Sequence, residues 1–156
     1  MRWLARYRAL RNALDATPRQ VALYTVVYLA AGTCMNWTGR HFAIAAFAHW
    51  WQVVTCYGLY LVPVSLLVRG RTALEQYAAG VLALVPLELA GYALGSSIAY
   101  DGNVIDAVVG PRNFTLAMCV LFGVIPPLGN ALVAAADQLL SSSARSRYPT
   151  PGSVRR

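Results

Sequence analysis

Four long apolar runs constrain this chain more than any other feature of its sequence. They cover approximately residues 21–35, 42–68, 77–99 and 114–135. A helix rises about 1.5 Å per residue and a bilayer core is about 30 Å thick, so each run crosses it with at most a few flanking residues. The chain is also 58% hydrophobic and only 12% charged, which is too apolar for an ordinary water-soluble domain. We therefore expect an all-α polytopic membrane protein with four transmembrane helices.

The second run is longer than a single span needs. Its outer part contains His49, Trp50, Trp51 and Gln52, and paired tryptophans beside polar residues are typical of the headgroup region. We expect this part to stand in the membrane interface rather than to tilt the whole helix.

The ends of the chain differ from the apolar centre. Apolar and aromatic residues recur at helical spacing along one stripe among arginines: Trp3, Tyr7, Leu10 and Leu14. Residues 1–17 therefore predict an amphipathic helix that lies on an anionic leaflet. Thr17 and Pro18 suit an N-cap and a first helical position, so the four-span bundle is expected over residues 18–137. Residues 138–156 are rich in Ser, Pro and Arg and predict a disordered cytoplasmic tail.

The arginines predict the orientation in the membrane. All thirteen basic residues are arginines, and eleven lie in the N-terminal segment, the loop after residue 68 or the C-terminal tail. The positive-inside rule then places both termini of a cell-membrane protein in the cytoplasm, with loops 36–49 and 100–113 outside. The net charge of +7 is thus explained by topology, and we predict no nucleic-acid partner.

Glu88 is the leading candidate site residue because it falls at the centre of the third run. A carboxylate at that depth is costly and is a functional candidate by default. Pro86, two residues earlier, frees the carbonyl of Leu82, which then needs a polar partner. Two interpretations remain open: a protonated acid satisfied by a tyrosine, or an acid that holds its proton in an apolar, aromatic-lined cavity. Residues expected at similar depth are Tyr28, Tyr57 and Tyr60, with Asn130 nearer the cytoplasm.

Prolines and glycines indicate kinks and close contacts. Pro63 interrupts the second span, and Pro126 with Pro127 breaks the fourth near its middle. Gly91 and Gly95 form a G-x-x-x-G pattern, which favours tight packing against another helix or, in a homo- or hetero-oligomer, against a partner.

The outward loops contain few charged groups. Arg40 and Arg112 are the only arginines there, and they either pair with Asp101 or Asp106 or bind an anionic head group. The spacing of the histidines and cysteines matches no metal site, so we predict neither metal nor cofactor.

One stretch resembles a known family. Pro86-Leu87-Glu88, followed by Gly91, Gly95, Tyr100 and Gly110-Pro111, is similar to a segment of the membrane-bound carotenoid hydratases. The Pro-Leu-Glu triplet also resembles part of the motif of small lycopene cyclase subunits, although Leu89 replaces the second acidic residue usual there. The resemblance implies protonation of an alkene in a long isoprenoid, with Glu88 as the acid.

The functional hypothesis is an intramembrane enzyme, or an enzyme subunit, that protonates, cyclises or hydrates an isoprenoid lipid as a lyase or isomerase. Glu88 would donate the proton, and the ring faces of Tyr57, Tyr60 and Tyr92 would stabilise a developing cation. The alternative is a non-catalytic subunit or assembly factor of a larger membrane complex. A third reading is a proton-coupled carrier, which a four-span unit could form only as an oligomer.

Overall fold

The computed structural model describes residue 11, residue 13 and residues 15–147. Most of the helix expected over residues 1–17, with its aromatic stripe, lies outside the described residues. The described elements are α2 (Pro18–His41), β1 (Ala45–Phe47), α3 (Trp50–Val53), η1 (Val54–Leu61), α4 (Val62–Val68), α5 (Ala73–Ala93), β2 (Ser97–Ala99), α6 (Val104–Val109), η2 (Pro111–Asn113), α7 (Phe114–Phe122) and α8 (Ile125–Arg147).

Three helical segments of the described chain are long and apolar enough to cross a membrane. They are Trp50–Val68, Ala73–Ala93 and Pro111–Ser142. The fourth long helix, α2, has 24 residues but is less apolar, because it includes Gln20, Asn36 and Arg40. The structure therefore supports a mostly helical protein with three candidate spans.

The start of α2 confirms the predicted cap. Thr17 lies at the N-cap, and its hydroxyl accepts the backbone N–H of Gln20 at 3.3 Å. The Gln20 side chain accepts the N–H of Thr17 in return at 3.0 Å, and Pro18 lies in the first turn. Two backbone donors that a helix start leaves unsatisfied are thus paired.

The second apolar run is helical only from Trp50 onward. Its helix contains an eight-residue π-helical stretch, η1, between α3 and α4. Pro63, just after η1, has no backbone N–H to continue the ladder. The residues before Trp50 form a turn and strand β1, so the extra length of this run lies outside the helix.

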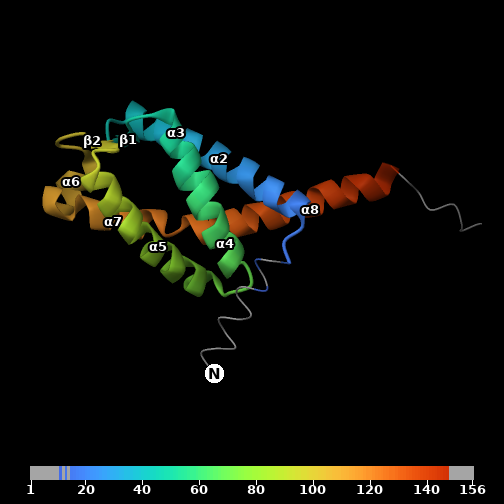
Figure 1. Cartoon of the computed structure of the whole chain (residues 1–156). Helices are drawn as coiled ribbons and strands as arrows, with labels where there is room; N and C mark the ends of the chain where they lie inside the picture. Colours follow the sequence, from blue (N-terminus) through green and yellow to red (C-terminus); the bar gives the residue numbers. More distant parts are fainter. Residues whose placement is uncertain (1–10, 12, 14, 148–156) are drawn as a thin grey trace, which may run out of the picture.

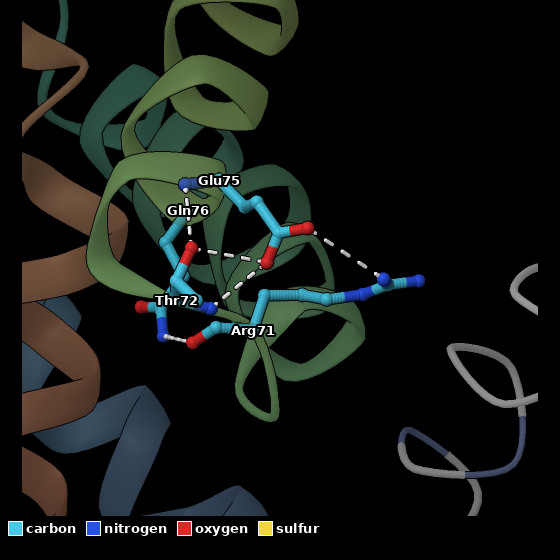
Figure 2. A network of polar contacts seen from close by, with 4 residues as sticks. All are labelled: Arg71, Thr72, Glu75 and Gln76. Carbon is cyan, nitrogen blue, oxygen red and sulfur yellow. Dashed lines mark hydrogen bonds and ion pairs between the residues drawn. The ribbon is translucent and has the colours of Figure 1, made fainter.

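The start of α5 is fixed by a network of polar contacts (Figure 2). The Thr72 hydroxyl accepts the N–H of Glu75 at 3.3 Å, and the Glu75 carboxylate accepts the N–H of Thr72 at 3.0 Å. Arg71 pairs with Glu75 at 3.9 Å and offers its carbonyl to the Gln76 side chain at 2.8 Å. This capping box satisfies the exposed end of the helix.

The third helix ends earlier than the sequence suggested. The expected span of residues 77–99 stops at Ala93, and Gly95 adopts a φ of +60° that ends the helix. Ser97–Ala99 is strand β2, which pairs antiparallel with β1, Ala46 opposite Ile98. Gly91 and Gly95 therefore do not share a helix face, contrary to the G-x-x-x-G interpretation.

The fourth run is broken where the sequence predicted. Helix α7 ends at Phe122 and α8 begins at Ile125, next to the two prolines. The tail expected from residue 138 is helical through Arg147, because no proline occurs there before Pro149 and serine and arginine allow a helix to continue. Residues 148–156 lie outside the described residues.

The helices pack around a core to which α2, α4, α5, α7, α8 and η1 all contribute. Its buried members are Tyr24, Tyr28, Val53, Cys56, Tyr57, Leu61, Val62, Leu66, Leu84, Cys119, Ile125 and Val133. Strands β1 and β2 lie at one end of the bundle with α6 nearby, and the C-terminal part of α8 extends beyond the opposite end (Figure 1).

Candidate functional site

Glu88 lies where two hollows of the protein meet. One is a cavity of about 80 Å³ at the centre of the bundle, here called the central cavity. The other, of about 430 Å³, is called the side groove. Both are lined by Phe47, Cys56, Glu88 and Ser97. A molecule in either hollow would therefore contact the same carboxyl group.

The central cavity is mainly apolar and aromatic. Helices α2, α5, α7, α8 and η1 form its walls, and strands β1 and β2 line one end. The apolar side chains that line its walls are Met35, Tyr57, Leu61, Leu84, Phe114, Met118, Phe122 and Ile125. Sequence reasoning did not identify Phe114, Met118 or Phe122, because nothing in an apolar run shows which of its residues face inward.

The side groove lies between α5 and the α3–η1 segment. Its lining is again largely apolar, with a few hydroxyl and amide groups. Besides the four residues shared with the central cavity, the residues that line it are Trp51, Gln52, Thr55, Leu59, Tyr60, Leu87, Ala90, Gly91, Leu94 and Ser96. Leu59 and Leu94 are 71% and 80% exposed, so the rim of the groove is open at the apolar surface of the protein.

The Glu88 carboxyl group has no hydrogen-bond or ion-pair partner among the described residues. The tyrosines that the sequence offered as partners bond elsewhere. Tyr60 donates to the carbonyl of Ala83 at 2.6 Å, and the Tyr57 hydroxyl contacts the sulfur of Met35 at 3.5 Å. The interpretation of Glu88 as an acid satisfied by a tyrosine is therefore not supported.

Tyr60 instead bonds to the backbone of α5 shortly before Pro86. From the sequence, Pro86 was expected to leave the carbonyl of Leu82 without its helical partner. The hydroxyl of Tyr60 donates to the carbonyl of the following residue, Ala83. This contact joins η1 to the turn of α5 that precedes Glu88, so it helps to fix the two walls of the side groove relative to each other.

Tyr28 and Asn130 belong to a separate polar network in the core. The hydroxyl of Tyr28 pairs with that of Ser65, which is fully buried. Asn130 accepts from Tyr24 and donates to Gln76 at 2.8 Å. The network joins α2, α4, α5 and α8, and satisfied buried polar groups of this kind favour one arrangement of the helices.

Of the other predicted site residues, two line the hollows beside Glu88 and three do not. Tyr57 lines the central cavity and Tyr60 the side groove. Tyr92 is 80% exposed and lines neither hollow. Arg40 and Arg112 also line neither one. The structure thus gathers Glu88, Tyr57 and Tyr60, and leaves the other three apart from them.

Arg40 has a structural contact of its own. Its guanidinium donates to the carbonyl of Phe47, and the Asn36 side chain accepts the N–H of Phe47 at 2.9 Å. Within the described chain, neither Arg40 nor Arg112 forms an ion pair with Asp101 or Asp106. The end of α2 therefore holds strand β1 over the central cavity.

The π-helix is the feature of the site that sequence reasoning missed most completely. Cys56, Tyr57 and Leu61 of η1 line the central cavity, while Thr55, Leu59 and Tyr60 line the side groove. π-Helical turns occur often at functional sites. The only signal for it in the sequence is Pro63, which marks an irregular ladder without giving its form.

The described residues contain no cluster of three His, Cys, Asp or Glu side chains that could hold a metal ion. His41 stacks on Trp37 with ring centres 5.3 Å apart, and His49 stacks on Trp51 at 6.1 Å.

No protein-family model matches this chain, and searches for similar curated proteins and solved structures gave no match.

Proposed function

We propose that this protein is an intramembrane enzyme, or a subunit of one, that protonates a carbon–carbon double bond of an isoprenoid lipid. One observation carries the proposal: the carboxyl group of Glu88 stands between two apolar hollows, and no described residue offers it a hydrogen-bond donor or a cation. An ionised carboxylate in these apolar, half-buried surroundings would lose part of its hydration without a compensating partner, which is costly. The neutral acid avoids that cost and still has a proton to donate.

The chemistry requires Glu88, the substrate and, for hydration, one water molecule. The proton of the carboxyl group adds to one alkene carbon, and positive charge develops on the other. In cyclisation, a second double bond of the substrate attacks the cation, and the new cation then loses a C–H proton. In hydration, water adds to the cation and loses a proton, and in isomerisation a neighbouring C–H loses its proton. The proton released from water or from carbon returns to the Glu88 carboxylate, which restores the acid for another cycle.

The aromatic rings around Glu88 suit a cationic intermediate. Tyr57 and Phe47 line the central cavity with Glu88, and Tyr60 lines the side groove. A ring face attracts a cation by about 0.5–2 kcal/mol, more strongly where water is excluded. The isoprenoid identity of the substrate rests on the resemblance around Pro86-Leu87-Glu88 and agrees with the apolar lining.

The proposal includes a topology. We place four spans in the cell membrane, with α2 as the first and the three candidate spans after it. Both termini are cytoplasmic, residues 1–17 lie on the inner leaflet, and β1 and β2 are on the outer side. The arginine distribution supports this orientation.

A second function is favoured by a different observation. Only 17% of the apolar, membrane-length stretch within α5 is buried in the bundle. Its large exposed side chains include Leu74, Leu82, Leu89 and Tyr92. A helix covered so little by its own chain could dock to another membrane protein. The alternative is therefore a non-catalytic subunit or assembly factor, with α5 at the interface.

Purification of the full chain in a mild detergent tests the two functions against each other. Lipids and proteins that accompany it are identified by mass spectrometry. The enzyme proposal expects a specific isoprenoid, retained by wild type and by Glu88→Gln, since the amide preserves the shape of the site. A partner protein in stoichiometric amount, with no isoprenoid, would favour the subunit function instead.

A further inference from the structure

The side groove offers a route to Glu88 from the side of the bundle. It runs between two candidate spans, Trp50–Val68 and Ala73–Ala93, which place its opening at the face where those helices would meet lipid. Leu59 on one wall and Leu94 on the other are largely exposed. Glu88 lies at the inner side of this opening, because it also lines the central cavity.

The end of the central cavity under the strands is lined by β1 and β2, which are held by several contacts. Ala46 in β1 is buried, and β1 pairs with β2 along its whole length. Asn36 and Arg40 bond to the N–H and the carbonyl of Phe47, which fixes β1 to the end of α2. These contacts hold the strands in place, whereas in the described chain the side groove has no such strand across its opening between α5 and η1.

We infer that the side groove is a binding site and lateral entrance for an apolar lipid chain, which reaches Glu88 from the hydrocarbon phase rather than from water. The groove is about 430 Å³ and the central cavity about 80 Å³. A single water molecule occupies roughly 10–15 Å³ of such a cavity volume, so the central cavity has room for only a few waters. Only a small part of a lipid chain therefore fits beyond Glu88. Most of the chain lies in the groove, against Leu59, Leu87 and Leu94.

This inference rests on the proposed function only for the reaction at Glu88. The route itself is a property of the walls of the groove, and it can be tested without a substrate. Carbodiimides serve as probes, because they add to a protonated carboxyl group and leave a stable acylurea. One reagent, dicyclohexylcarbodiimide, dissolves in the hydrocarbon phase, and a charged carbodiimide stays in water.

The first experiment compares the two reagents on the wild-type chain in lipid nanodiscs, where both membrane faces meet water. Labelled peptides are identified by mass spectrometry. We expect the hydrophobic reagent to label Glu88, and the charged reagent to label Glu75, whose side chain is 54% exposed, but not Glu88. Equal labelling of Glu88 by the charged reagent, or none by the hydrophobic one, would overturn the inference.

A matched pair of variants tests the groove itself. Leu59→Trp adds bulk inside the groove, whereas Leu82→Trp adds it on α5 outside both hollows. Both leucines are more than 70% exposed, so neither change crowds the core. Labelling of Glu88 by the hydrophobic reagent should slow several-fold in the first variant and stay unchanged in the second. Equal rates in the two variants would contradict the lateral entrance.

The two claims can fail separately. Lateral labelling of Glu88 together with normal product from Glu88→Gln would keep the entrance and reject the acid. Loss of product from Glu88→Gln with labelling from water would keep the acid and reject the entrance. The comparison of reagents on the wild type needs no variant to fold.

Discussion

Glu88 differs from the residues around it in its carboxyl group and in its lack of a polar partner among the described residues. Glu88 stands two residues after Pro86 on a helix whose other residues between 77 and 93 are uncharged. No described side chain donates a hydrogen bond to it, whereas Tyr28, Ser65, Gln76 and the other buried polar groups are paired. Glu88 itself is half-buried, so its carboxyl group is open to a molecule in either hollow.

The hydroxyl groups near Glu88 are used to hold the walls of the site. Tyr60 bonds to the backbone of α5, and Tyr57 packs against Gly32, where an added Cβ would come within 2.5 Å of its ring. Tyr57 still lines the central cavity and Tyr60 the side groove while their hydroxyls are occupied. This division suits the stabilisation of a cation by rings rather than proton transfer by tyrosine.

At the scale of elements, the bundle depends on the close approach of α5 to the break between α7 and α8. Gly80 faces Gly123 there, and a Cβ at Gly80 would lie 2.7 Å from the Gly123 carbonyl and 2.9 Å from the ring of Pro126. Backbone and proline atoms cannot turn aside as a flexible side chain does. Helix α5 can thus pack against the break between α7 and α8 only because both positions are glycine.

Gly80→Ala should therefore destabilise the fold, by about 1–3 kcal/mol as for other overpacked positions. Gly91→Ala is the matched control, because its nearest neighbours, the hydroxyls of Ser96 and Ser97, lie at ordinary distances of 3.4 and 3.7 Å. Alanine there should be neutral or slightly stabilising. Unfolding in sodium dodecyl sulfate, followed by tryptophan fluorescence, compares the two. Equal stability would contradict the close packing of α5 at the break.

At the scale of the whole molecule, the structure supports three candidate spans, and the proposed topology adds α2 as a fourth. Reporter fusions after Arg71 and after Arg156 should report cytoplasm, and fusions near Gly39 and Asn103 should report the outside. A cytoplasmic signal at Asn103 would contradict the four-span arrangement, because both ends of α5 would then lie on the same side of the membrane.

Much of this molecule could be predicted from periodicity, caps and prolines. The start of α2 at Thr17 and the break at Pro126 are local effects of one or two residues, and both are confirmed. Strands β1 and β2 could not be predicted, because each has three residues inside an apolar run and forms only by pairing with the other. Their pairing also explains why the third helix ends before Ser97.

The candidate site was predictable in its centre but not in its walls. Glu88 is conspicuous because charge is rare at that depth, and it does line both hollows. The direction of the neighbouring side chains depends on the π-helix, which changes the angular spacing of Tyr57 and Tyr60 from that of an α-helix. Tyr92 has the right residue type near the end of α5 and lies outside both hollows. Composition alone could not separate these tyrosines.

The central claim, that Glu88 donates a proton to an alkene, is tested most directly by product formation in Glu88→Gln. Glutamine keeps the size of the protonated acid but has no proton to give. Lipid extracts of membranes with equal amounts of each variant are compared by mass spectrometry for an isoprenoid that is isomerised or hydrated. Glu88→Leu is the control, since it also removes the polar group, and loss of its accumulation would indicate a packing defect. We predict normal accumulation of the Gln variant with product formation lowered about 10²–10⁴-fold, the usual contribution of a general acid. Wild-type amounts of product from Glu88→Gln would contradict the account.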